Sequence, residues 1–66
     1  MTRGLSNIIK RRRTALGLSQ RALAKHVGVS DAYITQLETR LRINPSLAVL
    51  KKLAKALKVS VGELVK

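Results

Sequence analysis

The sequence has 66 residues, which predicts a single domain over residues 1–66, and its lack of cysteine with only one histidine excludes disulfides, thiol nucleophiles and a Cys/His zinc site. Its 14 Lys and Arg residues against 3 Asp and Glu residues give a formal net charge of +11, so a polyanionic partner is expected. No apolar run approaches the about 20 residues that span a bilayer and no signal peptide is recognisable, so we expect a cytoplasmic protein that uses no membrane, metal, cofactor or small-molecule ligand.

The polyanion is expected to be double-stranded DNA. Proteins that bind single-stranded nucleic acid stack the bases on several aromatic rings, and this chain has one aromatic residue, Tyr33. Catalysis is not expected, because no Ser or Thr lies beside a base and the acids are dispersed.

The first predicted helix runs from about residue 4 or 5 to residue 16 and ends at Gly17 as its C-cap. Its apolar side consists of Leu5, Ile8, Ile9 and Leu16. The basic run Lys10–Arg13 spreads around most of the helix circumference, so its members cannot share one role. For Lys10 and Arg11, a solvated basic face is an open alternative to a binding role.

Residues 19–38 predict two short amphipathic helices joined by a glycine turn, the pattern of a helix-turn-helix. Ser19 and Ser30 are the expected N-caps, and Gly28 ends the first of the two helices. On the second helix, Ile34 and Leu37 form the apolar side. This recognition helix is expected over about residues 30–38, and an extension by one turn is an open alternative, because Leu41 continues the apolar spacing and no Gly follows Glu38.

Two further helices are expected after this motif. The fourth runs from about residue 45 to 57, with Asn44 as N-cap and Pro45 at its first position. It is expected to bury Leu47, Leu50, Leu53, Ala54 and Leu57 and to expose Lys51, Lys52, Lys55 and Lys58. Ser60 and Glu63 predict a capping box that begins a short fifth helix.

The sequence from residue 8 onward resembles the lambdoid phage repressor and Cro group and, more broadly, the XRE-type helix-turn-helix regulators. The matching stretches are Leu16-Gly17-Leu18-Ser19-Gln20, Leu23-Ala24-x-x-Val27-Gly28-Val29-Ser30, Ile34-x-x-Leu37-Glu38, Asn44-Pro45-Ser46 and Leu53-Ala54-x-Ala56-Leu57-x-Val59-Ser60 followed by Glu63-Leu64. The resemblance implies an all-α, compact five-helix, lambda-repressor-like DNA-binding domain. It also implies an ion pair between Arg13 and Glu38, and Glu38 lies at the edge of the apolar side, where an unpaired charge is unfavourable.

In such a motif the second helix enters the major groove, so the residues opposite Ile34 and Leu37 are expected to read bases. Gln36 can pair bidentately with adenine, and Ala32 can contact a thymine methyl group. Asp31 is a further candidate for base reading, although a carboxylate at the first helical position also stabilises the helix without DNA. Tyr33 flanks the reading side.

Other polar residues are expected to contact phosphate. The resemblance implies that Gln20, at the start of the first motif helix, holds the DNA backbone, and a helix N-terminus favours an anion there. The remaining candidates are Arg11, Arg21, Thr35, Arg40 and Arg42. His26 is expected to be a surface residue, because no second metal ligand is near it in the sequence.

The expected function is that of a sequence-specific transcriptional regulator associated with the nucleoid through DNA, a repressor that binds a pseudo-palindromic operator as a homodimer. Val61, Leu64 and Val65 are expected to form the dimer contact, because so short a helix cannot bury them all in its own domain. An antitoxin-type interaction module with secondary promoter binding is an alternative, as is a nonspecific architectural protein.

Overall fold

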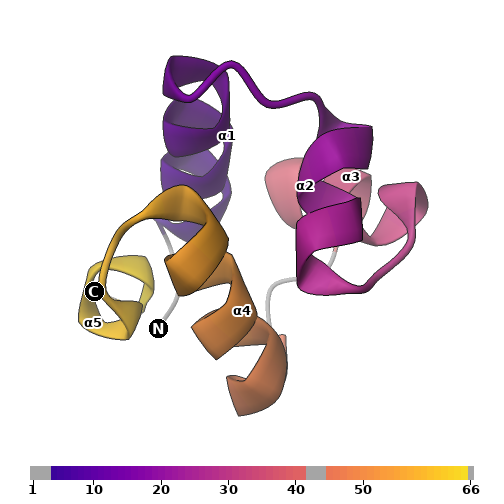
Figure 1. Cartoon of the computed structure of the whole chain (residues 1–66). Coiled ribbons are helices and arrows are strands. Elements are labelled where there is room, and N and C mark those ends of the chain that lie inside the picture. The colour runs from indigo at the N-terminus through magenta and orange to yellow at the C-terminus, as the bar shows by residue number, and fades with distance from the viewer. Residues whose placement is uncertain (1–3, 42–44, 66) are drawn as a thin grey trace.

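The computed structural model describes residues 4–41 and 45–65, and the five expected helices lie within them. They are α1 (Leu5–Ala15), α2 (Gln20–Val27), α3 (Asp31–Glu38), α4 (Leu47–Leu57) and α5 (Val61–Leu64), and no β-strand occurs in these two segments. In Figure 1, α4 lies between the pair α1 and α5 and the pair α2 and α3. The expected all-α, five-helix fold is confirmed. No helix in the described part of the chain is long and apolar enough to cross a membrane.

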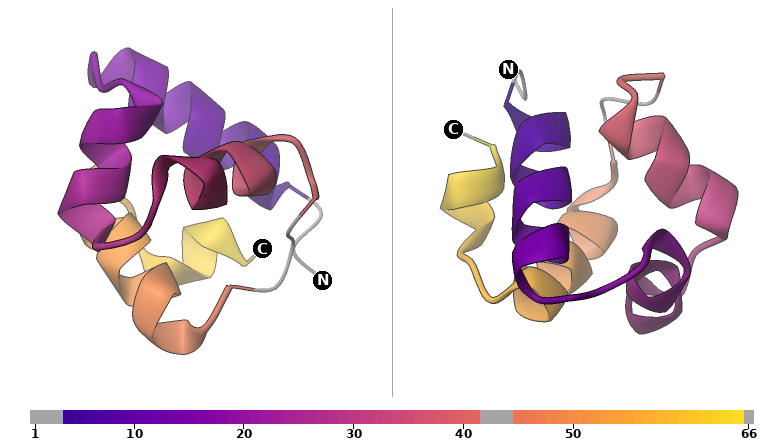
Figure 2. Two further views of the ribbon diagram at one scale, coloured as in Figure 1. Left: turned by 90° about the vertical axis from the view of Figure 1, so that its right-hand side faces the viewer. Right: turned by 90° about the horizontal axis from the view of Figure 1, so that it is seen from above.

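One hydrophobic core receives side chains from all five helices. α1 contacts α3, α4 and α5, while α2 contacts α3 and α4. The buried apolar residues are Leu5, Ile9, Leu23, Ala24, Val27, Ile34, Leu37, Leu50, Leu53, Ala54, Leu57 and Leu64. In the left view of Figure 2, α3 crosses the front of the molecule, so one side of it faces this core and the other faces solvent.

Serine side chains cap the N-termini of α2, α3 and α5, as the sequence predicts. Ser19 Oγ accepts a hydrogen bond from the Ala22 backbone N–H at 3.0 Å, and Ser30 Oγ accepts one from Tyr33 at 3.1 Å. The capping box of Ser60 and Glu63 is also present. Gly28 ends α2 with φ of +81°, in the left-handed region that glycine enters without strain. Gly28 and Ser30 thus fix the two ends of the turn between α2 and α3.

The bounds predicted for the recognition helix agree with the structure, and the alternative of one further turn past residue 38 is wrong. α3 ends at Glu38, and Arg40 has φ of +67°. A left-handed residue cannot continue an α-helix, so the chain turns away and leaves the Leu41 side chain 81% exposed. The left-handed conformation costs a residue with a Cβ about 1 kcal/mol, and Arg40 adopts it where glycine is the usual choice.

The predicted start of the fourth helix is also wrong. Ser46 is its N-cap, with Oγ accepting a hydrogen bond from the Val49 N–H at 3.2 Å, and α4 begins at Leu47. Pro45 therefore precedes the helix, and Asn44 lies outside the described residues. Because Leu47 occupies the first helical position on the outer side, it is 59% exposed and not buried as expected. The four lysines of α4 are exposed, in agreement with the prediction.

The C-terminal helix packs more completely than its length suggests. α5 lies beside α1 and α4, and Leu64 is fully buried in the core of its own domain. The expectation that Leu64 adds surplus apolar surface is therefore wrong. Val61 is half-buried against the same core, and only Val65, at 38%, is an exposed large apolar residue of this helix. The small domain uses Leu64 to close one end of its core.

Candidate nucleic-acid interface

The outward side of α3 carries the residues predicted to read bases. Ile34 and Leu37 are buried beneath it, whereas Asp31 and Ala32 are exposed at its N-terminal end. Tyr33 and Gln36 are half-buried on the same helix. The four candidates thus belong to a single short helix at the molecular surface, which is a shape that the major groove can accept.

Arg13 and Glu38 form the expected ion pair, which joins α1 to the end of α3. Arg13 Nε donates to Glu38 Oε2 at 2.6 Å and Arg13 Nη2 donates to Glu38 Oε1 at 3.1 Å, a bidentate arrangement. Arg13 Nη1 also donates to the Leu18 carbonyl at 2.8 Å, in the loop before α2. The two side chains are only 12% and 3% exposed, so solvent screens the pair weakly.

Gln20 extends this pair into a network that reaches the surface. Its Nε2 donates to Glu38 Oε1 at 3.0 Å, and its Oε1 accepts from Thr35 Oγ1 at 2.8 Å. The network therefore fixes the first residue of α2 against two residues of α3 that lie one turn apart. Since an amide nitrogen carries two hydrogens, one N–H of Gln20 has no acceptor among the described residues.

The same network changes what is expected of Thr35. Its hydroxyl has one hydrogen, which it gives to Gln20, so Thr35 donates to a phosphate only if it breaks that bond. The sequence did not predict the bond between Gln20 and Thr35. A signal was available, because Thr35 and Glu38 are three residues apart and share one side of the helix.

The basic run Lys10–Arg13 separates into two pairs. Lys10 and Arg11 are exposed, whereas Arg12 and Arg13 are half-buried and hydrogen-bonded inside the protein. Arg12 Nε donates to the Leu57 carbonyl at 3.2 Å, near the C-terminal end of α4, an interaction that sequence reasoning missed. Lys10 and Arg11 are thus the members of this run whose side chains are exposed.

The other predicted phosphate contacts lie around α2 and α3. Arg21 is exposed on the first turn of α2. Arg40 is exposed just after α3, and its Nε donates to Ser6 Oγ at 3.2 Å, which ties the base of the guanidinium group to α1. Arg42 lies outside the described residues. Among the residues described, no group of three His, Cys, Asp or Glu side chains is placed to hold a metal ion.

Comparison with known proteins assigns the family. A sequence model of the helix-turn-helix family matches residues 9–64. An uncharacterized HTH-type transcriptional regulator of Mycobacterium tuberculosis is 44% identical over 54 residues, which are 82% of this chain and 38% of that protein. The regulator SinR of Bacillus subtilis is 39% identical over 56 residues, 85% of this chain and 50% of SinR. The chain thus spans half or less of the length of these two relatives.

Solved structures agree with this result. The N-terminal DNA-binding domain of SinR superposes with a TM-score of 0.89 at 35% identity, over 96% of this chain and 91% of that one. The P22 c2 repressor in complex with a synthetic operator superposes with a TM-score of 0.89 at 39% identity, over 94% of this chain and 92% of that one. The chain therefore belongs to the XRE-type helix-turn-helix family of DNA-binding transcriptional regulators.

Proposed function

We propose that this protein is a sequence-specific repressor that binds an operator as a homodimer, with α3 of each protomer in the major groove. The observation that carries the proposal is the position of α3. Asp31 and Ala32 are exposed on its outward side and Gln36 is half-buried there, while the bonds of Glu38 to Arg13 and Gln20 hold its C-terminal end against α1 and α2. A reading helix needs this rigidity, because base discrimination depends on side chains held at hydrogen-bond distance.

The base-reading roles follow from side-chain chemistry and position. Gln36 pairs with an adenine through its amide, and Ala32 packs against a thymine methyl group. Tyr33 contacts the edge of the site. Asp31 favours a cytosine amino group and disfavours registers that place its carboxylate near phosphate. Asp31 also stabilises the N-terminus of α3.

Phosphate contacts hold the protein in register on the DNA. The remaining N–H of Gln20 and the N-terminus of α2 act together at one phosphate, in a position that Glu38 and Thr35 fix. Arg21, Arg40 and Arg11 neutralise neighbouring phosphates. Support comes from relatives, because SinR and the P22 c2 repressor have both been solved in complex with DNA.

Replacement of Gln36 by alanine is expected to weaken binding to the preferred site by about 1–3 kcal/mol, because a bidentate pair with one base is lost. Binding to unrelated duplexes should change little, since phosphate contacts dominate it. Fluorescence anisotropy with both duplexes measures the two effects. The matched control is Arg21→Ala, which should weaken both complexes equally and reduce the salt slope by about 1. Equal losses on both duplexes for Gln36→Ala would remove this residue from base reading.

We propose a dimer contact at Leu41 and Leu47 as an alternative to the one expected at Val61, Leu64 and Val65. Leu64 is buried in its own domain, whereas Leu41 and Leu47 are the large apolar residues with the greatest exposure among those described, at 81% and 59%. Leu41 follows the reading helix and Leu47 begins α4. When two protomers occupy successive major grooves, the leucines of one protomer can pack against those of the other. Large exposed apolar side chains favour such a contact.

The double variant Leu41→Ser/Leu47→Ser is therefore expected to lose cooperative binding of two protomers to inverted half-sites and to keep the affinity for a single half-site. Serine adds no charge, so the electrostatic attraction to DNA is unchanged. Val65→Ser is the matched comparison, because Val65 is the remaining exposed large apolar residue in segments 4–41 and 45–65. Gel-shift titrations resolve the complexes with one and two protomers. Loss of cooperativity in Val65→Ser alone would place the contact at α5 instead.

Selection of binding sites from random duplex DNA tests the function as a whole. The expected result is an enriched motif with two inverted half-sites whose centres lie one helical turn, about 34–36 Å, apart. Recovery of sequences without a shared motif would identify a nonspecific binder and would overturn the proposal.

A further inference from the structure

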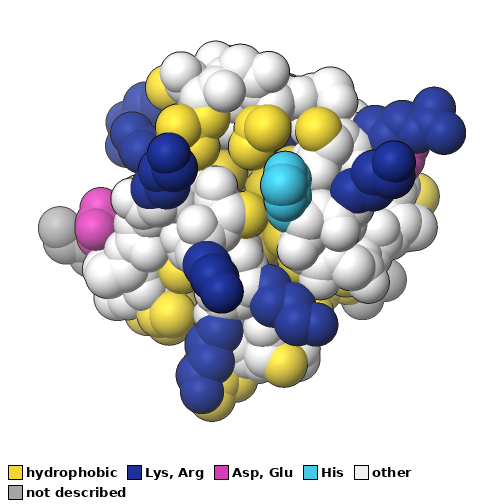
Figure 3. Space-filling model, in the orientation of Figure 1, with side chains coloured by type: hydrophobic (Ala, Val, Ile, Leu, Met, Phe, Trp, Pro, Cys, Tyr) yellow, Lys and Arg dark blue, Asp and Glu magenta, His cyan; other side chains and the backbone are white. Residues whose placement is uncertain are grey.

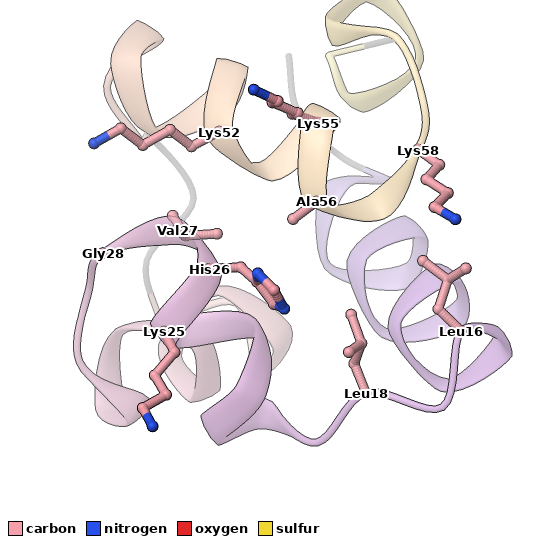
Figure 4. A pocket seen from close by; sticks show the side chains of 10 residues that line it. All are labelled: Leu16, Leu18, Lys25, His26, Val27, Gly28, Lys52, Lys55, Ala56 and Lys58. Atoms are coloured by element: carbon pink, nitrogen blue, oxygen red, sulfur yellow. The ribbon is translucent and has the colours of Figure 1, made fainter.

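A groove opens between α2 and α4, away from the outward side of α3. Its volume is about 660 Å³, and its apolar lining comes from Leu16, Leu18, Val27 and Ala56. Figure 4 shows Leu18 and Ala56 turned toward the middle of the groove, with the His26 ring between them. In Figure 3 apolar side chains gather in this hollow beside the single histidine, and Lys and Arg side chains lie around it. No lining residue belongs to α3.

Four lysines surround the opening: Lys25 on α2, and Lys52, Lys55 and Lys58 on or beside α4. Figure 4 shows their side chains directed away from the groove centre, around its edge. None of them forms an ion pair with a residue in the described segments. The groove is therefore apolar inside and strongly positive at its rim.

The acids of this chain do not balance that charge. Of the 3 Asp and Glu residues, Glu38 is paired with Arg13, and Glu63 is bound to Ser60 in the capping box. Asp31 lies at the start of α3, outside the groove. The acids within residues 1–66 therefore leave the rim of the groove positive.

We propose that this groove is a docking site for an acidic amphipathic helix of a partner protein. Two or three large apolar side chains of that helix, spaced i, i+3 or i+4 and i+7, fill the floor between α2 and α4, and its Asp and Glu side chains face the lysines. Charge complementarity selects the sign of the partner and speeds the encounter, and the apolar floor supplies the burial. A second DNA duplex fits less well, because a phosphate backbone has no apolar groups to fill the floor.

The groove and the outward side of α3 share no residue, so the partner helix and DNA do not compete for the same side chains. The groove is thus suited to a protein that acts on the regulator while it occupies its operator. This inference goes beyond DNA recognition and does not depend on which operator is read.

The test uses a small panel of synthetic peptides of about 15 residues, a length at which a helix can begin to form. Each carries leucines at i, i+4 and i+7 or at i, i+3 and i+7, with glutamates between them. Titration into the ¹⁵N-labelled protein is expected to shift the amide resonances of Leu18, His26 and Ala56 in a saturable way. The same peptides with alanine in place of leucine should produce no saturable shift at these residues.

Two charge-reversal variants with equal net charge separate docking from general attraction. Lys52→Glu/Lys55→Glu is expected to weaken peptide binding about tenfold, through loss of two favourable pairs and gain of two repulsive ones. Lys10→Glu/Lys51→Glu changes two exposed lysines outside the groove and should weaken binding much less. Circular dichroism checks that both variants are folded.

Several outcomes would overturn the docking site. They are the absence of a saturable shift with every peptide, shifts spread over cationic residues on all faces, or equal weakening in the two charge-reversal variants. A short duplex DNA that shifts Leu18, His26 and Ala56 without shifting α3 would assign the groove to nucleic acid instead.

Discussion

Replacement of Arg13 by alanine is expected to lower the free energy of unfolding by about 3 kcal/mol, because it leaves Glu38 nearly buried with a single hydrogen bond, from Gln20. The change also removes the donor to the Leu18 carbonyl. Stabilities of natural domains are about 5–15 kcal/mol, so the loss is a large fraction for a chain this small. Urea denaturation followed by circular dichroism measures it.

Arg11→Ala is the matched control, since it removes the same side chain from an exposed position of the same helix. Its effect should stay within about 0.5 kcal/mol. A double-mutant cycle with Glu38→Gln separates the pairing from the other contacts of Arg13. Equal stability of Arg13→Ala and Arg11→Ala would show that the ion pair does not stabilise the fold.

Arg13 is protonated and positively charged at neutral pH and well above it. The hydrogen bond to Glu38 raises the pKa of the Arg13 guanidinium above its usual value, with a further contribution from the Glu38 charge, and partial burial opposes this only in part. A raised pKa stabilises the folded state below the unfolded-state pKa, and this contribution disappears only as the pH rises through the folded-state pKa. The stabilisation that Arg13 contributes is therefore fully present near neutral pH.

The affinity for operator DNA is expected to fall by about 10³ to 10⁵ between 50 and 200 mM salt, if the dimer neutralises about six to ten phosphates. The structure limits the residues that contribute, because the Arg13 guanidinium is bound to Glu38 and to the Leu18 carbonyl inside the domain. Among the described residues, Arg11, Arg21 and Arg40 are the exposed arginines that we propose to contact phosphate, and each releases counterions with a slope of about −0.9. Anisotropy titrations at several salt concentrations give the slope.

Lys51→Ala is the control for this measurement, because Lys51 is an exposed lysine on α4. It should leave the salt slope unchanged, whereas Arg21→Ala should reduce it. A flat salt response of the parent protein would argue against DNA as the ligand.

Local signals in the sequence predicted most of the fold. Ser19, Ser30 and Gly28 act through bonds to residues within a few positions, so their roles follow from residue type and spacing. Tertiary packing determines which apolar side chains are buried where local signals do not. Leu64 is buried because α1 and α4 form a site for α5, and the exposed Leu41 follows from the left-handed Arg40. The sequence around Leu64 does not reveal the site for α5, and the sequence around Leu41 does not reveal the conformation of Arg40.

The candidate nucleic-acid interface also combines contacts that the sequence predicts with contacts that only packing determines. The family resemblance predicted Arg13 and Glu38 as a pair, but the bonds of Gln20 to Glu38 and Thr35 depend on how α2 crosses α3. Arg12 looked like a member of a basic surface run until α4 placed the Leu57 carbonyl beside it. The groove between α2 and α4 could not be predicted, because its lining residues come from separate parts of the chain.

The most direct test of sequence-specific binding through α3 is a comparison of two dissociation constants at one salt concentration. The first duplex carries the selected operator, and the second has the same base composition in scrambled order. The parent protein is expected to bind the operator at least about 10³ times more tightly, the lower end of the range for specific regulators. Gln36→Ala should lose a large part of this ratio. Equal dissociation constants for the two duplexes in the parent protein would contradict the claim that α3 reads a base sequence.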